Sequence, residues 1–150
     1  MPERDILDLE HFLPYRLSVL SNRISQDIAR LYADRFGLGI TEWRVLAVLG
    51  RRDDLSAREV AERTAMDKVA VSRAVASLQA AGRIERDTHG DDRRRSVMRL
   101  SPAGRAIYED VAPMALAYQR RLLEGLDTDE RATLDRLLTR VEEREAATRD

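Results

Sequence analysis

The side chains of this sequence offer little chemistry beyond that of arginine and carboxylate groups. The 150 residues include no cysteine and two histidines, His11 and His89, which lie in different predicted elements. The lack of cysteine excludes a disulfide framework, a thiolate zinc finger and a cysteine redox switch. Two separated histidines also argue against a multi-histidine zinc site. Since no His-Glu-x-x-His motif, phosphate-binding glycine loop or Gly-x-Ser-x-Gly elbow is present, we expect neither an enzyme nor a bound metal or cofactor.

The charged residues are distributed unevenly, although the net charge is only −1. Residues 56–99 contain ten basic and seven acidic side chains, whereas both flanks are acidic. Within this segment Arg93, Arg94 and Arg95 directly follow a pair of aspartates that ends with Asp92. A carboxylate two residues before an arginine can hold its guanidinium by a charge-assisted hydrogen bond. An arginine held in this way suits the narrow, negative minor groove of DNA, and an exposed charged loop is the alternative.

A second candidate site is the helix predicted between Asp67, its N-cap, and Gly82, the residue after its end. At about 100° per residue its apolar side chains gather on one face, which we expect to be buried: Val71, Ala74, Val75 and Leu78. The opposite face is small and uncharged apart from one arginine: Val69, Ser72, Arg73, Ala76, Ser77 and Ala80.

Small side chains on an outward helix face let the helix approach base edges in the major groove of DNA. Arg73 could then donate to guanine, and Val69 could meet a thymine methyl group. Ser72 and Ser77 could bond bases or phosphates. The alternative is that an alanine- and serine-rich helix is simply a good helix former packed on a partner.

Two predicted helices precede the helix that begins after Asp67, and a predicted hairpin follows it. Thr41 is expected to cap a short apolar helix, and Ser56 to Glu59 read as a capping box that opens a helix reaching about Arg63. A three-residue break then separates that helix from the one after Asp67, which is the helix-turn-helix pattern. Strands predicted at 83–88 and 96–100 flank the arginine-rich turn and make it a β-hairpin. Helix-turn-helix and hairpin together predict a winged helix.

Long amphipathic helices are predicted on both sides of this region. The helix over about 12–36 has an apolar stripe of Leu13, Leu17, Leu20, Ile24, Ile28 and Leu31. The region after Pro102 carries two more stripes, which are formed by Ile107, Val111, Met114, Tyr118 and Leu122 and by Leu134, Leu137, Leu138 and Val141. These stripes exceed what a small winged-helix core can cover, so we expect a homodimer. A two-fold dimer predicts a pseudo-palindromic DNA site with half-sites about 10 bp apart.

The sequence resembles the MarR family of bacterial regulators. The resemblance rests on the segment from Leu55 to Ala61, on Asp92-Arg93-Arg94-Arg95, and on Leu100-Ser101-Pro102-Ala103-Gly104. It implies a mainly α fold with a small β-wing, in one domain over 1–150. The winged helix-turn-helix would span about 41–101, and helices over about 12–36 and 102–147 would form the dimerisation domain.

The resemblance also implies which residues contact double-stranded DNA. Ser72 and Arg73 match base-reading positions, Asp92 and Arg94 match the wing pair, and Arg86 matches the arginine after the recognition helix, where it either touches DNA or is structural. The full set of candidate DNA-binding residues is Lys68, Val69, Ser72, Arg73, Ser77, Arg86, Asp92, Arg93, Arg94 and Arg95.

Members of this family are typically repressors released by small aromatic or amphipathic effectors, so the resemblance implies a ligand-responsive repressor. It leaves an aromatic acid and an acyl-thioester open as effector classes. The candidate effector-binding residues are His11, Tyr15, Arg16, Trp43, Arg44, Met114 and Tyr118. Core packing of Trp43, and burial of the tyrosines and methionine in a dimer interface, are the alternatives.

Other functions remain open from the sequence. A transcriptional activator of the same fold, or a helical protein-interaction module without DNA binding, would also be compatible with the helical stripes. No run of about 18 apolar residues is present, and the acidic N-terminal segment does not resemble a signal peptide. We therefore expect a cytoplasmic protein with no membrane contact.

Overall fold

A computed structural model of the chain describes residues 5–52, 54–87 and 96–149. The chain divides into two compact units, Met1–Met114 and Ala115–Asp150, which are described separately below. Among the described residues no helix has the length and apolar character needed to cross a bilayer.

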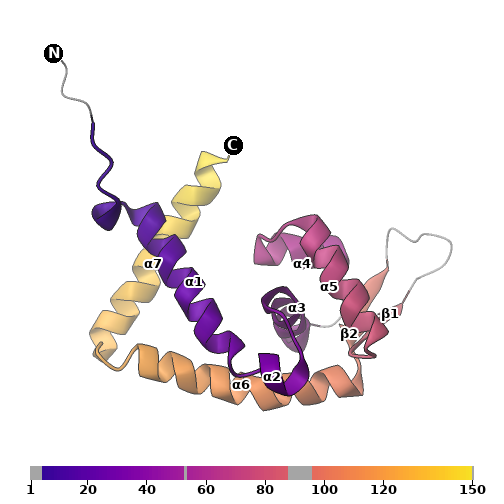
Figure 1. Cartoon of the computed structure of the whole chain (residues 1–150). Helices are drawn as coiled ribbons and strands as arrows, with labels where there is room; N and C mark the ends of the chain where they lie inside the picture. Colours follow the sequence, from indigo (N-terminus) through magenta and orange to yellow (C-terminus); the bar gives the residue numbers. More distant parts are fainter. Residues whose placement is uncertain (1–4, 53, 88–95, 150) are drawn as a thin grey trace. The chain divides into compact units, whose positions relative to one another are not determined.

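The first unit begins with a short 3₁₀ turn, η1 (Leu9–His11), followed by α1 (Leu13–Ala29) and α2 (Ala33–Phe36) (Figure 1). Pro14 falls in the first turn of α1, where its missing N–H costs little. The prediction of one helix over 12–36 is wrong at Tyr32, whose φ of −132° leaves the helical region between α1 and α2. The break lets the Tyr32 ring enter the core, where the residue is 1% exposed.

The next three helices are α3 (Ile40–Arg51), α4 (Ala57–Thr64) and α5 (Lys68–Ala80). Thr41 is not the cap of α3, because Gly39 holds that position and donates its N–H to Oε1 of Glu42 (3.0 Å). The predicted capping box at Ser56 is confirmed by the bond from the Glu59 N–H to the Ser56 hydroxyl (3.1 Å).

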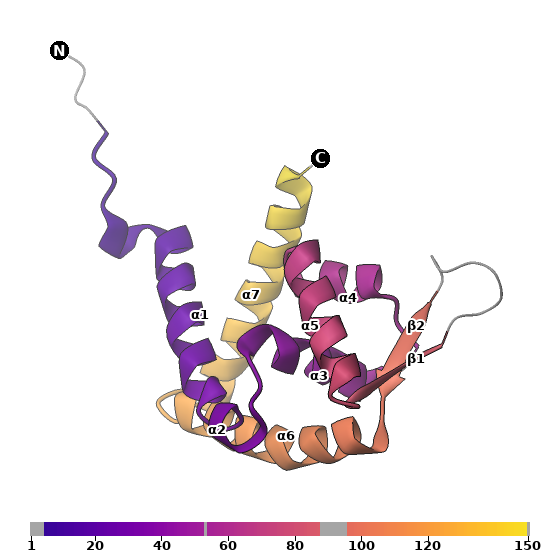
Figure 2. The ribbon, with the colours of Figure 1, turned by 45° about the vertical axis from the view of Figure 1, so that its right-hand side comes forward.

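A two-stranded antiparallel sheet follows, with β1 (Ile84–Asp87) paired to β2 (Val97–Leu100), so both predicted strands are confirmed with slightly shorter ends. Ile84 lies opposite Leu100, and Asp87 lies opposite Val97. Leu55 adds a bridge to Met98 on the other side of β2. The hairpin packs beside the end of α5, as Figures 1 and 2 both show.

The core of the first unit lies between these elements. It is formed by apolar residues of the region after α1: Tyr32, Leu38, Val45, Leu46, Leu49, Leu55, Val60, Ala61, Val71, Ala74, Val75, Leu78, Ile84, Met98, Leu100, Ile107 and Val111. Each element of the helix-turn-helix contributes to this one cluster, so the core fixes α5 against α3 and α4.

The helix α6 (Pro102–Leu122) begins in the first unit and ends in the second, which also contains α7 (Thr128–Thr148). Asp127 caps α7 and forms the predicted capping box with Glu130. No described side chain of the second unit is buried. Its apolar stripe along α7 is therefore open to solvent in the single chain.

Candidate nucleic-acid interface

The helix α5 has the two faces that the sequence predicts. Val71, Ala74, Val75 and Leu78 are buried in the core. The residues of the opposite face are exposed, which applies to Val69, Ser72, Arg73, Ala76, Ser77 and Ala80. Asp67 caps the helix by accepting the Ala70 N–H (3.1 Å), and Gly82 takes a left-handed φ of 72° after its end. The face is thus presented by a helix fixed at both ends.

The predicted DNA-binding residues on α5 differ in whether their side chains are already bonded within the chain. Within the described part of the chain the Arg73 guanidinium and the Lys68 ammonium have no acceptor, and Val69 is 58% exposed. The Ser77 hydroxyl instead donates to Oε2 of Glu42 (2.9 Å). Ser77 therefore ties α5 to the first turn of α3, and this tie was not predicted from the sequence.

Arg73 borders a hollow of about 380 Å³ between α5 and the start of α3. The hollow is lined by residues of α5 and of the start of α3, which are Gly39, Ile40, Thr41, Glu42, Ala70, Arg73, Ala74 and Ser77. Arg73 thus borders a surface depression and is exposed, so it is accessible to an acceptor from outside.

Toward the turn end of the hairpin, Arg86 bonds the residue that precedes β2. Its Nε donates to the Ser96 hydroxyl (2.8 Å), and Ser96 is only 5% exposed. The bond gives Arg86 a structural role in closing the hairpin. The other predicted wing residues, Asp92, Arg93, Arg94 and Arg95, lie outside the described residues, as does His89.

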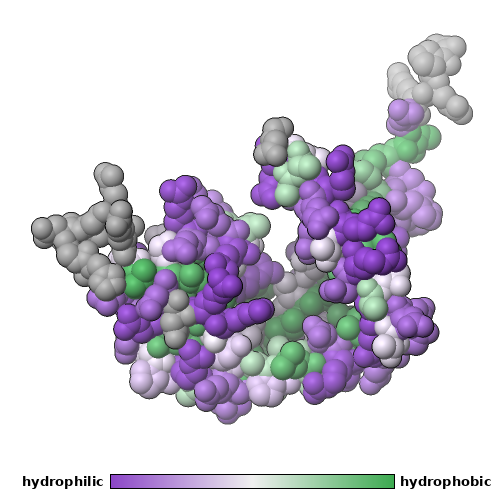
Figure 3. All heavy atoms as spheres, turned by 180° about the vertical axis from the view of Figure 1, so that it is seen from behind, coloured by the Kyte–Doolittle hydropathy of each residue, from purple (hydrophilic) through white to green (hydrophobic). Residues whose placement is uncertain are grey.

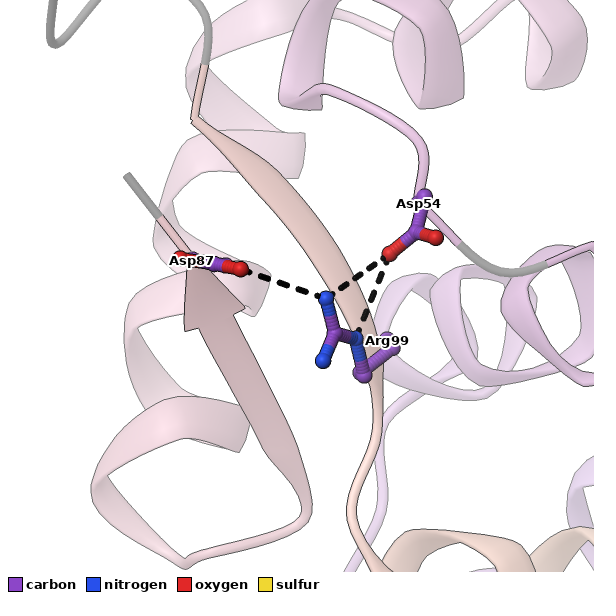
Figure 4. A network of polar contacts seen from close by, with 3 residues as sticks. All are labelled: Asp54, Asp87 and Arg99. Atoms are coloured by element: carbon purple, nitrogen blue, oxygen red, sulfur yellow. Dashed lines mark hydrogen bonds and ion pairs between the residues drawn. The ribbon is translucent and has the colours of Figure 1, made fainter. Parts of the chain in front are cut away.

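Arg99, on β2, bonds both Asp87 on β1 and Asp54 in the connection between α3 and α4 (Figure 4). Sequence reasoning missed this role. Its guanidinium donates to Oδ1 of Asp54 (3.0 and 3.2 Å) and to Oδ2 of Asp87 (3.4 Å). The bonds to Asp54 and the surrounding negative charges raise the pKa of Arg99. The alternation along β2, in which Met98 and Leu100 are buried, is the signal that could have placed Arg99 on the outer side.

Asp54 itself has a φ of 62°, which is uncommon for a residue other than glycine. Its N–H donates to the Met98 carbonyl (3.0 Å), so backbone and side chain both hold this loop against β2. The connection between α3 and α4 thereby braces the hairpin from which the wing extends.

The candidate effector residues on α3 are engaged in packing. The Trp43 ring stacks on Tyr32 at a centroid distance of 5.4 Å and on Tyr108 at 6.4 Å. Arg44 donates to the Ser25 hydroxyl on α1 (2.9 Å). Burial raises the pKa of the Tyr32 hydroxyl, and the charge of Arg44 offsets part of that rise.

The remaining candidates lie in four places. His11 is exposed and bonds Asp8 through Nδ1 (2.7 Å), and Met114 packs against the core from α6. Tyr15 and Arg16 border a hollow of about 400 Å³ along α1, together with Leu13, Leu17, Val19, Leu20 and Arg23. Tyr118 belongs to the second unit. In the described residues, no three His, Cys, Asp or Glu side chains gather as a metal site would require.

Comparison with known proteins identifies relatives of the chain. A family model described as the MarR family matches residues 36–95, the segment from α2 to the hairpin. Among curated proteins none matches the sequence.

Solved structures extend the likeness to the flanking helices. A MarR/EmrR family transcriptional regulator from Acinetobacter sp. ADP1 has 28% identity and a TM-score of 0.86, over 94% of this chain and 99% of that one. A probable transcriptional regulator from Pseudomonas aeruginosa has 32% identity and a TM-score of 0.67, over 87% and 99%. FabT from Streptococcus pneumoniae, solved in complex with DNA, has 22% identity and a TM-score of 0.74, over 94% and 99%.

These matches agree with the geometry of the first unit. The family model covers α3, α4, α5 and β1, and the likeness to the solved relatives also takes in β2 and the helices before and after the winged helix. The chain therefore belongs to the MarR family of winged-helix transcriptional regulators.

Proposed function

We propose that this protein regulates transcription by binding double-stranded DNA with α5 in the major groove. The observation that carries the proposal is the outward face of α5, which is exposed, small, and charged only at Arg73. A solvated face would ordinarily carry several charged side chains, whereas a face that meets base edges needs small ones. Arg73 is the residue that we expect to donate to a guanine.

The hairpin supports a second DNA contact, beside that of α5. Arg86 and Arg99 tie the two strands to each other and to Asp54 through Ser96, Asp54 and Asp87, and β1 packs against α5. We propose that Arg94, positioned by Asp92, enters the adjacent minor groove, and that Arg93 and Arg95 bind phosphates. The DNA complex of the pneumococcal relative FabT is consistent with this use of the fold.

The regulator is proposed to act as a homodimer. On α1, Leu13, Leu17 and Leu20 are 49%, 40% and 52% exposed, and in Figure 3 apolar atoms reach the surface near the N-terminal end. The stripe along α7 is similarly exposed, at 39% to 45% for Leu134, Leu137, Leu138 and Val141. Contiguous apolar surface of this kind is commonly covered by a partner chain. A Leu137→Glu change should therefore produce monomers in sedimentation, whereas Arg136→Gln on the same helix should not.

The proposed regulator is a repressor that a small effector releases from a pseudo-palindromic operator. The hollow beside Tyr15 and Arg16 is one place where an aromatic carboxylate could bind, because Arg16 can bond the carboxylate. The stacked ring of Trp43 is a natural reporter, since it is the chain's single tryptophan. Activation instead of repression would appear as reduced reporter expression after deletion of the gene.

The experiment is to select bound duplexes from a random DNA pool and to measure affinity for the recovered sequence by fluorescence anisotropy. We expect two inverted half-sites about one helical turn apart. Arg73→Gln should weaken binding by about 1–3 kcal/mol, or roughly 5- to 150-fold, and relax the preference at one base pair per half-site. Arg136→Gln removes the same charge from α7 and serves as the control. Recovery of no sequence, or equal losses in both variants, would contradict the proposal.

A further inference from the structure

A second basic site lies away from the outward face of α5. The last turn of α3 and the last turn of α4 enclose a hollow of about 490 Å³. It is lined by two small aliphatic residues, Ala47 and Val48, and by three arginines, Arg51, Arg52 and Arg63. All three arginines are exposed, and none of their guanidinium groups has a hydrogen-bond or ion-pair partner among the described residues.

The described carboxylates of α3, of α4 and of the connection between them are engaged elsewhere. On α3, Glu42 accepts from Gly39 and Ser77. On α4, Glu59 accepts from the Ser56 N–H and Glu62 accepts from Arg58 (3.1 Å). The described carboxylate between the two helices, Asp54, is bonded to Arg99. Asp53 lies outside the described residues.

Helix ends alone do not account for this arrangement. A cation near a helix C-terminus gains from the helix dipole, which explains an arginine in the last turn of either helix. It does not explain why three arginines, from the end of α3 and the last turn of α4, line the same hollow, since like charges near each other repel. An anion in the hollow would convert that repulsion into attraction.

We propose that this hollow binds an anion through Arg51, Arg52 and Arg63. Guanidinium groups present paired N–H donors that match the oxygens of a carboxylate or phosphate. The size of the hollow and its aliphatic side favour an anion that carries an apolar or sugar part over a bare inorganic ion. An anion of this kind is supplied either by the backbone of bound DNA or by a free organic molecule, and two measurements distinguish these sources.

The first measurement is a titration of the DNA-free protein with phenyl phosphate, followed by NMR of the arginine Nε–H groups. We expect the signals of Arg51, Arg52 and Arg63 to shift together with one dissociation constant. Replacement of Arg51 and Arg63 by glutamine should weaken binding at least about tenfold, since bonds to charged groups are being removed. Arg58→Gln changes an arginine on α4 outside the hollow and should leave the affinity unchanged. Equal shifts of all exposed arginines, or unchanged affinity in the double variant, would overturn a free-anion site.

The second measurement is the salt dependence of DNA binding by the same variants. The plot of log K against log salt concentration has a negative slope. If the hollow receives DNA phosphates, the Arg51→Gln/Arg63→Gln variant should make that slope shallower by about one for each phosphate that is no longer neutralised. If it receives a free anion, that slope should be unchanged while phenyl phosphate binding is abolished. The proposal would be overturned if the double variant changed neither phenyl phosphate binding nor the salt dependence of DNA binding. If the protein binds no DNA, the NMR titration alone tests whether the hollow binds an anion.

Discussion

Substitution of Gly104 by alanine should destabilise the fold, because this glycine lies where α6 meets the end of the hairpin. A Cβ built on Gly104 would overlap the carbonyl oxygen of Arg83 and would lie 3.0 Å from its carbonyl carbon. That oxygen also accepts the Ser101 N–H (3.1 Å), while the Ser101 hydroxyl donates to the Gly82 carbonyl (2.6 Å). The obstacle is therefore backbone held by hydrogen bonds, which cannot rotate away.

The expected size of the effect follows from two opposing terms. Overpacking of a well-packed site costs about 1–3 kcal/mol, and a rigid obstacle favours the upper end of that range. Alanine recovers up to about 1 kcal/mol as the better helix former. The net loss should be about 2 kcal/mol, which for a chain of this length lowers Tm by about 4–8 °C.

The assay is thermal unfolding followed by circular dichroism at one fixed protein concentration, since a dimer's Tm depends on concentration. Gly125→Ala is the matched control, because nothing lies within 4 Å of a Cβ at that position. It should change stability by no more than about 0.5 kcal/mol. A Gly104→Ala protein that melts like the wild type would refute the argument that the backbones of α6 and the hairpin are closely packed.

Three further predictions concern other parts of the first unit. Ala65 ends α4 with a left-handed φ of 52°, so Ala65→Gly should stabilise the protein by about 0.5 kcal/mol in chemical unfolding, and a loss of stability would contradict the strained turn. Because burial raises the pKa of Tyr32 in the folded state, its contribution to stability is complete below about pH 10 and is lost as pH rises through the folded pKa. Tyr32→Phe should therefore show a smaller fall in Tm between about pH 9 and 11 than the wild type, and an equal fall would refute this. Arg99→Gln should change the Tm little, since its ion pairs are exposed, yet weaken DNA binding by releasing the hairpin; full DNA affinity would show that the brace is not needed.

Much of the winged helix could be predicted from local signals. Ser56 with Glu59, Asp67, Gly82, and Asp127 with Glu130 all occupy the cap or end positions expected of them. The two faces of α5 followed from periodicity alone, because a regular helix places every residue at a known angle.

The errors arise where tertiary contacts override a local pattern. The apolar stripe predicted for the helix over 12–36 runs to Leu31, but the chain leaves the helix at Tyr32, whose ring is buried and stacks on Trp43. Thr41 is a good capping residue, yet Gly39 and Glu42 close the first turn of α3 ahead of it, and Glu42 also receives Ser77.

The candidate site was only partly accessible to sequence reasoning. Arg73 and Ser72 were found because exposure follows from helix geometry, and both are exposed. The bonds between Arg99 and Asp54, 45 residues away, and the convergence of Arg51 and Arg63 depend on the fold. No spacing along the chain indicates which distant side chains meet.

The central claim, that the outer face of α5 lies against DNA bases, can be tested by site-directed cleavage. The chain has no cysteine, so Ser72→Cys gives a single attachment point for an iron chelate on that face. A Ser18→Cys change on α1 provides the comparison. We predict that the chelate at position 72 cuts the bound operator within two half-sites about one helical turn apart, whereas the chelate at position 18 does not. Bound DNA left uncut from position 72, or cut equally from both positions, would contradict the account.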